Sequence, residues 1–175
     1  MAALAVVMAA GAAESQQLNV KIGVVSDMSS LDADMGGPGS VAAAKLAVAD
    51  FAKSNPNVKV EMISGDHQNK PDVGTQLANQ WFDVDKVDMI IDIPNSGVAL
   101  AVSQVASQKN KLFIVSGAAA SDLTGPKCNA NTIHWTYDTW MLANGTGTAM
   151  VKTGGDSWFF LTADYAFGHA LERDT

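Results

Sequence analysis

The stretch VKIGVVSDMSSLDADMGGPGSVAAAKLAVADF (residues 20–51) joins an apolar run to a helical pattern through a glycine-rich loop. The run Val20–Val25 is typical of a buried strand. From Pro38 to Phe51 apolar residues recur at helical spacing, and proline suits the first turn of a helix. A strand that leads into a helix is the repeating unit of a parallel sheet. The stretch therefore predicts an α/β fold and raises the question of a phosphate site at its glycines.

The glycines resemble a dinucleotide-binding loop only in part. Residues 37–42 spell G-x-G-x-x-A, but in such loops the first glycine follows the strand directly. Here residues 26–36 intervene, and three of them, Asp27, Asp32 and Asp34, would repel a phosphate. The loop is also too long for a Walker motif, and no Gly-Lys-Ser/Thr follows. We interpret the glycines as the bend of a long loop that leaves its preceding side chains to line a cleft.

The rest of the chain repeats the alternation of strands and helices. Further strands are expected at Val58–Ser64, Val87–Ile93, Lys111–Gly117 and Ser157–Ala163, and further helices from Pro71, over Ser96–Asn110, over Thr139–Lys152 and from Phe167. This order predicts a parallel sheet with helices on both faces. Ligands of such sheets bind beyond the carboxyl ends of the strands. The expected functional edge comprises Ser26–Gly37, Ser64–Lys70, Pro94–Gly97 and Ser116–Ser121.

The two ends of the chain predict its organisation. Residues 1–13 are small, apolar and uncharged, with Ala10-Gly11-Ala12 as a cleavage pattern and a polar sequence after it. They predict a secretory signal, the alternative being a buried alanine-rich helix. We expect a first lobe over residues 14–124, a crossing segment over residues 125–138, and the truncated start of a second lobe over residues 139–175.

Composition and motifs point away from nucleic acid and from catalysis. Hydrophobic residues make up 47% of the chain, the net charge is −7, and no basic cluster follows a helix face. The three histidines are scattered, and no G-x-S-x-G motif is present. The single cysteine, Cys128, is either a buried free thiol or paired with a cysteine outside this sequence.

The expected sheet edge offers hydroxyls and free backbone N–H groups where helices start, near Ser96 and near Ser116–Ser121. Such groups suit a carboxylate, because the N-terminus of a helix favours negative charge. The alternative is that these hydroxyls are plain helix caps. Two helix starts on adjacent strand ends favour an anion site.

Four blocks resemble the branched-chain amino-acid-binding family of periplasmic solute-binding proteins, the type I binding-protein fold that serves ABC importers. They are ADMGGPGSVAAAKLAVADF, IPNSGVALAV, VSGAAASDLT and TADYAFGHALE, in the family's order and spacing from Val20 to the end. The resemblance implies two α/β lobes joined by hinge strands that close on a ligand. In the amino-acid binders of this family, hydroxyls and backbone amides after the third and fourth strands hold the ligand carboxylate.

Carried over to this sequence, the resemblance implies a ligand site made of Met35, Ser96, Ala118, Ala119, Ala120, Ser121 and Phe167. Ser96 matches the serine that follows the family's third strand. Ala120 stands where the family often has a threonine, with Ser121 next to it. Met35 falls at a frequently aromatic position and Phe167 at a tyrosine.

The segment IHWTYDTW (residues 133–140) resembles a subgroup whose relatives include binders of aromatic carboxylates. Tryptophan and tyrosine can stack on a ligand ring. The alternative is that Trp135 and Trp140 pack in the protein core.

Together these features imply a receptor, not an enzyme. It would capture a small carboxylate, either an amino acid or an aromatic acid, in the periplasm and deliver it to ABC permease subunits. We expect a monomer without a cofactor, a metal or a nucleic-acid partner. The alternatives are a ligand-sensing domain of a regulator with the same fold and, disfavoured by the displaced glycines, a Rossmann-type NAD-dependent oxidoreductase.

Overall fold

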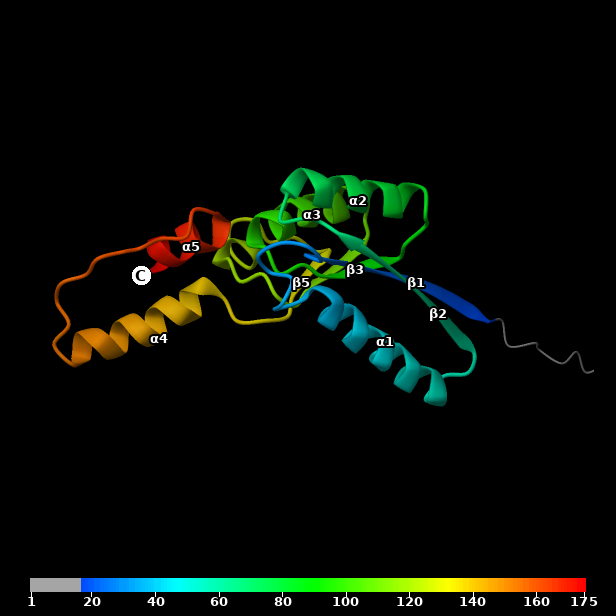
Figure 1. The fold of residues 1–175 in the computed structure, drawn as a ribbon, viewed down its shortest axis with the longest axis horizontal. Helices are drawn as coiled ribbons and strands as arrows, with labels where there is room; N and C mark the ends of the chain where they lie inside the picture. The colour runs from blue at the N-terminus through cyan, green and yellow to red at the C-terminus, as the bar shows by residue number, and fades with distance from the viewer. Residues whose placement is uncertain (1–16) are drawn as a thin grey trace, which may run out of the picture.

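A computed structural model describes residues 17–175 and contains a five-stranded sheet (Figure 1). The strand order is β2-β1-β3-β4-β5, and every neighbouring pair is parallel. The strands are β1 (Leu18–Ser26), β2 (Val58–Asp66), β3 (Met89–Asp92), β4 (Leu112–Val115) and β5 (Thr132–His134). The predicted α/β class with a parallel sheet is confirmed. The predicted secretory signal lies outside the described residues.

Helices cover both faces of this sheet. They are α1 (Gly37–Ser54), α2 (Pro71–Asp83), α3 (Ser96–Gln108), the short 3-10 helix η1 (Ser121–Leu123), α4 (Thr139–Lys152) and α5 (Ala166–Asp174). Figure 1 shows α2 and α3 on one face, α1 on the other, and α4 and α5 projecting to one side. Within residues 17–175, no helix is both long and apolar enough to cross a membrane.

Local sequence explains where the helices begin. Pro38 and Pro71 stand in the first turns of α1 and α2, where the missing N–H of proline costs no helical hydrogen bond. The side chains of Asn95 and Asp138 cap α3 and α4, accepting from the amides of Val98 at 3.1 Å and Met141 at 2.8 Å.

The main core lies between the sheet and helices α2 and α3. It includes Trp81, Ile90 and Phe113, all buried. Two glycines in the strands make room for the indole of Trp81. A Cβ atom at Gly23 would overlap that ring, and one at Gly65 would lie 2.9 Å from it. The sheet is thus packed so closely against this core that even one added methyl group would disturb the packing.

Two sequence predictions need correction in the last third of the chain. The predicted strand Ser157–Ala163 is an irregular segment, with the side chains of residues 158–161 exposed. A strand needs a neighbour to satisfy its backbone groups, and residues 139–175 contain no second strand. Cys128 is exposed, so the prediction of a buried thiol is wrong. Residues 125–138, expected as a crossing segment, contain the short strand β5, which pairs with β4.

Candidate ligand-binding site

The loops that follow β3 and β4 meet at the carboxyl edge of the sheet. These strands are paired in parallel, with Asp92 beside Val115, so the two loops leave the sheet side by side. The backbone amides of Ala119 and Ala120 both donate to the hydroxyl oxygen of Ser96, each at 3.2 Å. Ser96 and these alanines are buried. The structure thus brings together Ser96 and Ala118–Ala120, as expected from the sequence.

A strained turn places Ser96. Asp92 and Ile93 adopt φ values of 83° and 65°, a left-handed conformation that side-chain-bearing residues, above all β-branched ones, rarely take. Hydrogen bonds hold the turn: the Ile93 amide donates to the Val25 carbonyl at 2.9 Å, and the Ala118 amide donates to the Ile93 carbonyl at 3.0 Å. Strain of this kind persists where the surroundings impose it, often at binding sites.

Asp92 and Gly117 let the two loops approach each other. The Ser116 hydroxyl donates to Asp92 Oδ1 at 3.0 Å, while Asp92 Oδ2 is buried without a hydrogen-bond partner. A Cβ atom at Gly117 would lie 2.9 Å from the Pro94 Cα atom, so a larger residue would push the loops apart. Neither role was predicted from the sequence, because both depend on contacts between distant segments.

Two groups from β5 and the start of α4 hold carbonyl groups of the loop Ala118–Ala120, named here the alanine loop. His134 Nε2 lies 2.7 Å from the Ala118 carbonyl oxygen, and the Thr139 amide donates to the Ala119 carbonyl at 2.8 Å. A carbonyl oxygen only accepts, so His134 Nε2 carries the hydrogen. From the sequence, His134 is only one of three scattered histidines, and a bond to a backbone carbonyl leaves no pattern that would have revealed it.

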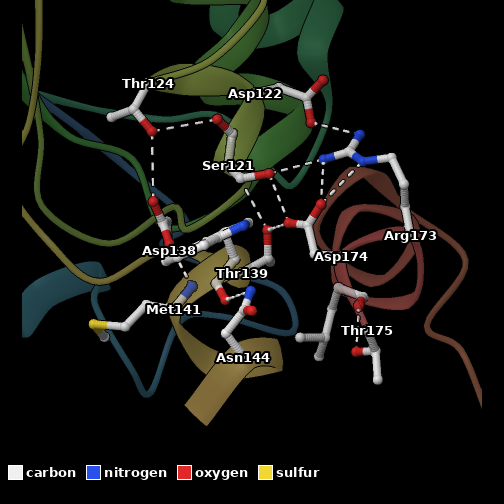
Figure 2. Close-up of polar contacts among 12 residues, drawn as sticks. Ser121, Asp122, Thr124, Asp138, Thr139, Met141, Asn144, Arg173, Asp174 and Thr175 are labelled. Atoms are coloured by element: carbon white, nitrogen blue, oxygen red, sulfur yellow. Dashed lines mark hydrogen bonds and ion pairs between the residues drawn. The ribbon is translucent and has the colours of Figure 1, made fainter. Parts of the chain in front are cut away.

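Ser121 belongs to a polar cluster with Asp122, Thr139, Arg173 and Asp174, named here the α5 cluster (Figure 2). The Ser121 amide donates to Thr139 Oγ1 at 3.0 Å, and its hydroxyl donates to Asp174 Oδ2 at 2.7 Å. Arg173 donates to the Ser121 hydroxyl oxygen at 2.8 Å and pairs with Asp122 at 2.9 Å. Both donors of Ser121 are therefore engaged within the protein.

The carboxylate of Asp174 is the centre of the α5 cluster. Burial by itself would raise the pKa of Asp174, but hydrogen bonds from Ser121, Thr139 and Arg173, together with the charge of Arg173, hold it below its ordinary value. The charged form is thus the stable one. The cluster fastens the end of α5 to η1 and to the start of α4 (Figure 2).

Met35 and Phe167 lie on other elements than the alanine loop. Met35 is 77% exposed on the loop before α1, and Phe167 lies half-buried in the first turn of α5. The Phe167 ring is tilted against that of Tyr165, with centroids 5.9 Å apart. Burial, then the nearby charges of Asp32 and Tyr137, raise the pKa of Tyr165. Tyr165, just before α5, therefore interacts electrostatically with Asp32 of the loop between β1 and α1.

The aspartates of that loop have a structural role. Asp27 is buried and accepts hydrogen bonds from the Ser29, Ser30 and Asp32 amides and from the Ser30 hydroxyl. Burial opposes ionisation of Asp27, but these bonds lower its pKa. The Gly37 amide at the start of α1 donates to the Ser26 hydroxyl oxygen at 2.9 Å.

Within the described residues, no group of three or more His, Cys, Asp or Glu side chains could hold a metal ion.

In this chain the loops after the third and fourth strands of a parallel sheet converge on a buried hydroxyl, and further helices follow. This arrangement is that of one lobe of a type I solute-binding protein. The chain belongs to the periplasmic binding protein family, whose sequence model matches residues 19–175. The predicted family and fold class are confirmed. None of the curated proteins matches the chain.

Solved structures give the same result. A periplasmic binding protein from Burkholderia mallei is 48% identical, with a TM-score of 0.85. A branched-chain amino acid ABC transporter periplasmic ligand-binding protein from Burkholderia xenovorans is 38% identical, with a TM-score of 0.75. An ABC transporter solute-binding protein from Rhodopseudomonas palustris, in complex with 3,4-dihydroxybenzoic acid, is 25% identical, with a TM-score of 0.78. Each match covers 89% of this chain and 42% of the other.

The matched family and these relatives are binding proteins and not enzymes, which confirms the prediction of a non-catalytic protein. The oxidoreductase alternative has no support among them. The family is periplasmic, so its members act outside the cytoplasm. The chain spans less than half the length of these relatives.

Proposed function

We propose that the chain is part of the extracytoplasmic receptor of an ABC importer. In this proposal residues 1–13 are the secretory signal, residues 14–124 the first lobe, residues 125–138 the crossing, and residues 139–175 the start of the second lobe. The receptor, a monomer, captures a small carboxylate in the cleft between its lobes and delivers it to the permease subunits in the membrane.

The observation that most supports a carboxylate ligand is the convergence of the Ala119 and Ala120 amides on the Ser96 hydroxyl oxygen, each at 3.2 Å. This oxygen lies in the first turn of α3, where the helix dipole favours negative charge. Because Ser96 Oγ accepts from two amides, its own hydrogen is free to be donated to a ligand oxygen. Hydrogen bonds to a charged group contribute about 1.5–3 kcal/mol each.

Two kinds of carboxylate fit this proposal. An aromatic acid is favoured by the exposed rings of Trp135 and Tyr137 on the crossing segment, and the Rhodopseudomonas relative holds 3,4-dihydroxybenzoic acid. An amino acid is favoured by the Burkholderia xenovorans relative, a branched-chain amino acid transport protein. In both cases the carboxylate would lie at Ser96 and Ala118–Ala120. We propose Met35 and Phe167 as further contacts, from the β1–α1 loop and from α5.

Isothermal titration calorimetry on the full-length receptor tests this proposal, with 3,4-dihydroxybenzoate and leucine as probes. We expect one of them to bind with micromolar or tighter affinity. Ser96→Ala should weaken that binding by about tenfold or more, because the buried carboxylate loses a donor. Ser107→Ala, near the other end of α3, is the matched control and should leave the affinity unchanged. Equal affinities of the two variants would contradict the site.

A further inference from the structure

His134 makes a short hydrogen bond to the alanine loop from a rigid position. Its Nε2–H group donates to the Ala118 carbonyl oxygen at 2.7 Å. His134 is the last residue of β5 and lies in register with Val115 of β4. The Trp135 amide continues the pairing by donating to the Val115 carbonyl at 2.7 Å. The half-buried imidazole is therefore carried by the sheet and not by a free loop.

The Ala118 carbonyl and the Ala119 amide belong to the same peptide group. In a trans peptide the C=O and N–H bonds point in opposite directions, and no peptide within residues 17–175 is cis. The oxygen of this group faces His134 while its N–H faces Ser96 Oγ at 3.2 Å. Because the peptide group is planar, holding the Ala118 C=O bond in place also fixes the direction of the Ala119 N–H bond.

The next peptide group is held in the same way by a backbone donor. The Ala119 carbonyl accepts from the Thr139 amide at 2.8 Å, and the Ala120 amide faces Ser96 Oγ. Since almost any residue at position 139 would supply that amide, only the carbonyl of the first peptide group depends on a particular side chain. Without His134, the buried Ala118 carbonyl would lack this partner and the peptide could rotate to find another.

We propose that His134 is a positioning residue of the ligand site, which holds the Ala118–Ala119 peptide so that the Ala119 amide points to Ser96 and to the ligand carboxylate. His134 acts through the backbone and touches no ligand atom. The inference rests on the proposed function only for its effect on affinity, because the orientation of the amide is a property of the protein alone.

Two variants of the full-length receptor separate the donor from the ring. His134→Gln places an N–H group at the same number of bonds from the backbone as Nε2, so it keeps the donor. His134→Phe keeps an aromatic ring of similar size without a donor. Should the Phe variant not fold, His134→Asn takes its place, because its side chain is one bond too short to reach the Ala118 carbonyl.

The first measurement needs no ligand. Amide hydrogen exchange, followed by NMR on receptor labelled with ¹⁵N-alanine, reports the Ala119 N–H directly. We expect His134→Phe to speed exchange at Ala119 by about tenfold and His134→Gln to restore it. Two other alanines are internal controls whose exchange rates should not change. The Ala118 amide donates to the Ile93 carbonyl, and the Ala99 amide donates to the Asn95 carbonyl.

The second measurement is the affinity for 3,4-dihydroxybenzoate. We expect it to fall about tenfold in His134→Phe and to recover in His134→Gln, with similar melting temperatures for all three proteins. Unchanged Ala119 exchange, equal acceleration at Ala99, or an unchanged affinity in His134→Phe would each overturn the inference. If the wild type binds neither this probe nor leucine, the proposed function fails, and the exchange measurement alone decides the role of His134.

Discussion

Residues 18–134 and residues 139–175 bury their apolar side chains to very different degrees. In the first region Trp81, at 4% exposure, lies in a core between sheet and helices. In the second, Trp158 is 45% and Leu161 95% exposed, and the region is fastened by the α5 cluster instead. The first region is thus stabilised mainly by hydrophobic burial and the second by polar contacts. This difference is in keeping with the proposal that residues 14–124 and residues 139–175 belong to different lobes.

Two tryptophan variants test this difference most strongly. In the 175-residue chain, Trp81→Ala should lower the free energy of unfolding by about 3–5 kcal/mol, because it empties the space between Gly23 and Gly65. Trp158→Ala should change it by less than about 0.5 kcal/mol, because this ring is partly in water. Urea unfolding measures both values. Similar costs for the two variants would show that the regions do not differ in this way.

The 175-residue chain and the full-length receptor should differ in their affinity for the ligand. A micromolar ligand needs a net binding free energy of about −8 kcal/mol, and its contacts must in addition offset an association cost on the order of 4 kcal/mol or more. The Ser96 hydroxyl and the Ala119 and Ala120 amides, which already donate to Ser96 Oγ, contribute only part of the free energy required. The 175-residue chain should therefore bind a carboxylate about a thousandfold more weakly than the full-length receptor, at millimolar affinity.

Calorimetry on the two proteins side by side checks this expectation. Micromolar binding by the 175-residue chain would mean that the second lobe contributes little, and the cleft between lobes would have to be abandoned as the binding site.

The α5 cluster should respond to acid through Asp174. Its pKa is lower in the folded state than the ordinary 3.8, so its stabilising effect is complete above that pH and is lost as the pH falls through the folded value. Asp174→Asn should cost about 1.5–3 kcal/mol near neutral pH, because three donors lose a charged acceptor.

The difference in melting temperature between wild type and Asp174→Asn measures this effect as a function of pH. It should be constant above about pH 5 and shrink as the pH falls below about 4. Asp156→Asn, an exposed aspartate of the same region, is the control and should match the wild type. A difference that stays constant to low pH would contradict the assigned role of the Asp174 carboxylate.

The smallest effect is expected at Cys128. This thiol is exposed, and the sequence offers no second cysteine to pair with it. Cys128→Ser should leave the affinity of the full-length receptor unchanged within about threefold, as calorimetry would measure. A loss beyond about tenfold with folding intact would reveal a disulfide or a role in the site.

The first region could be predicted well because its signals are local. Runs such as Val20–Val25 and the prolines that open α1 and α2 indicate strands and helices by themselves. Ser96 and Ala118–Ala120 could be singled out because parallel strands present their carboxyl ends at one edge, and because a family resemblance covered both loops. The structure joins them by direct hydrogen bonds.

The remainder depends on partners that no local pattern reveals. Residues 157–163 have the composition of a strand but pair with no strand within residues 17–175. The left-handed turn at Asp92 and Ile93 contains no glycine, so nothing in the sequence marks it. His134 acts on a carbonyl sixteen residues away, and that carbonyl has no side-chain signature.

The central claim is that a ligand carboxylate binds where the Ser96 hydroxyl and the Ala119 and Ala120 amides converge. A crystal structure of the full-length receptor with 3,4-dihydroxybenzoate or leucine, whichever binds, tests it most directly. We predict a carboxylate oxygen within about 2.7–3.2 Å of Ser96 Oγ and of at least one of these two amide nitrogens. A carboxylate bound away from this loop, with both amides still directed only to Ser96 Oγ, would contradict the claim.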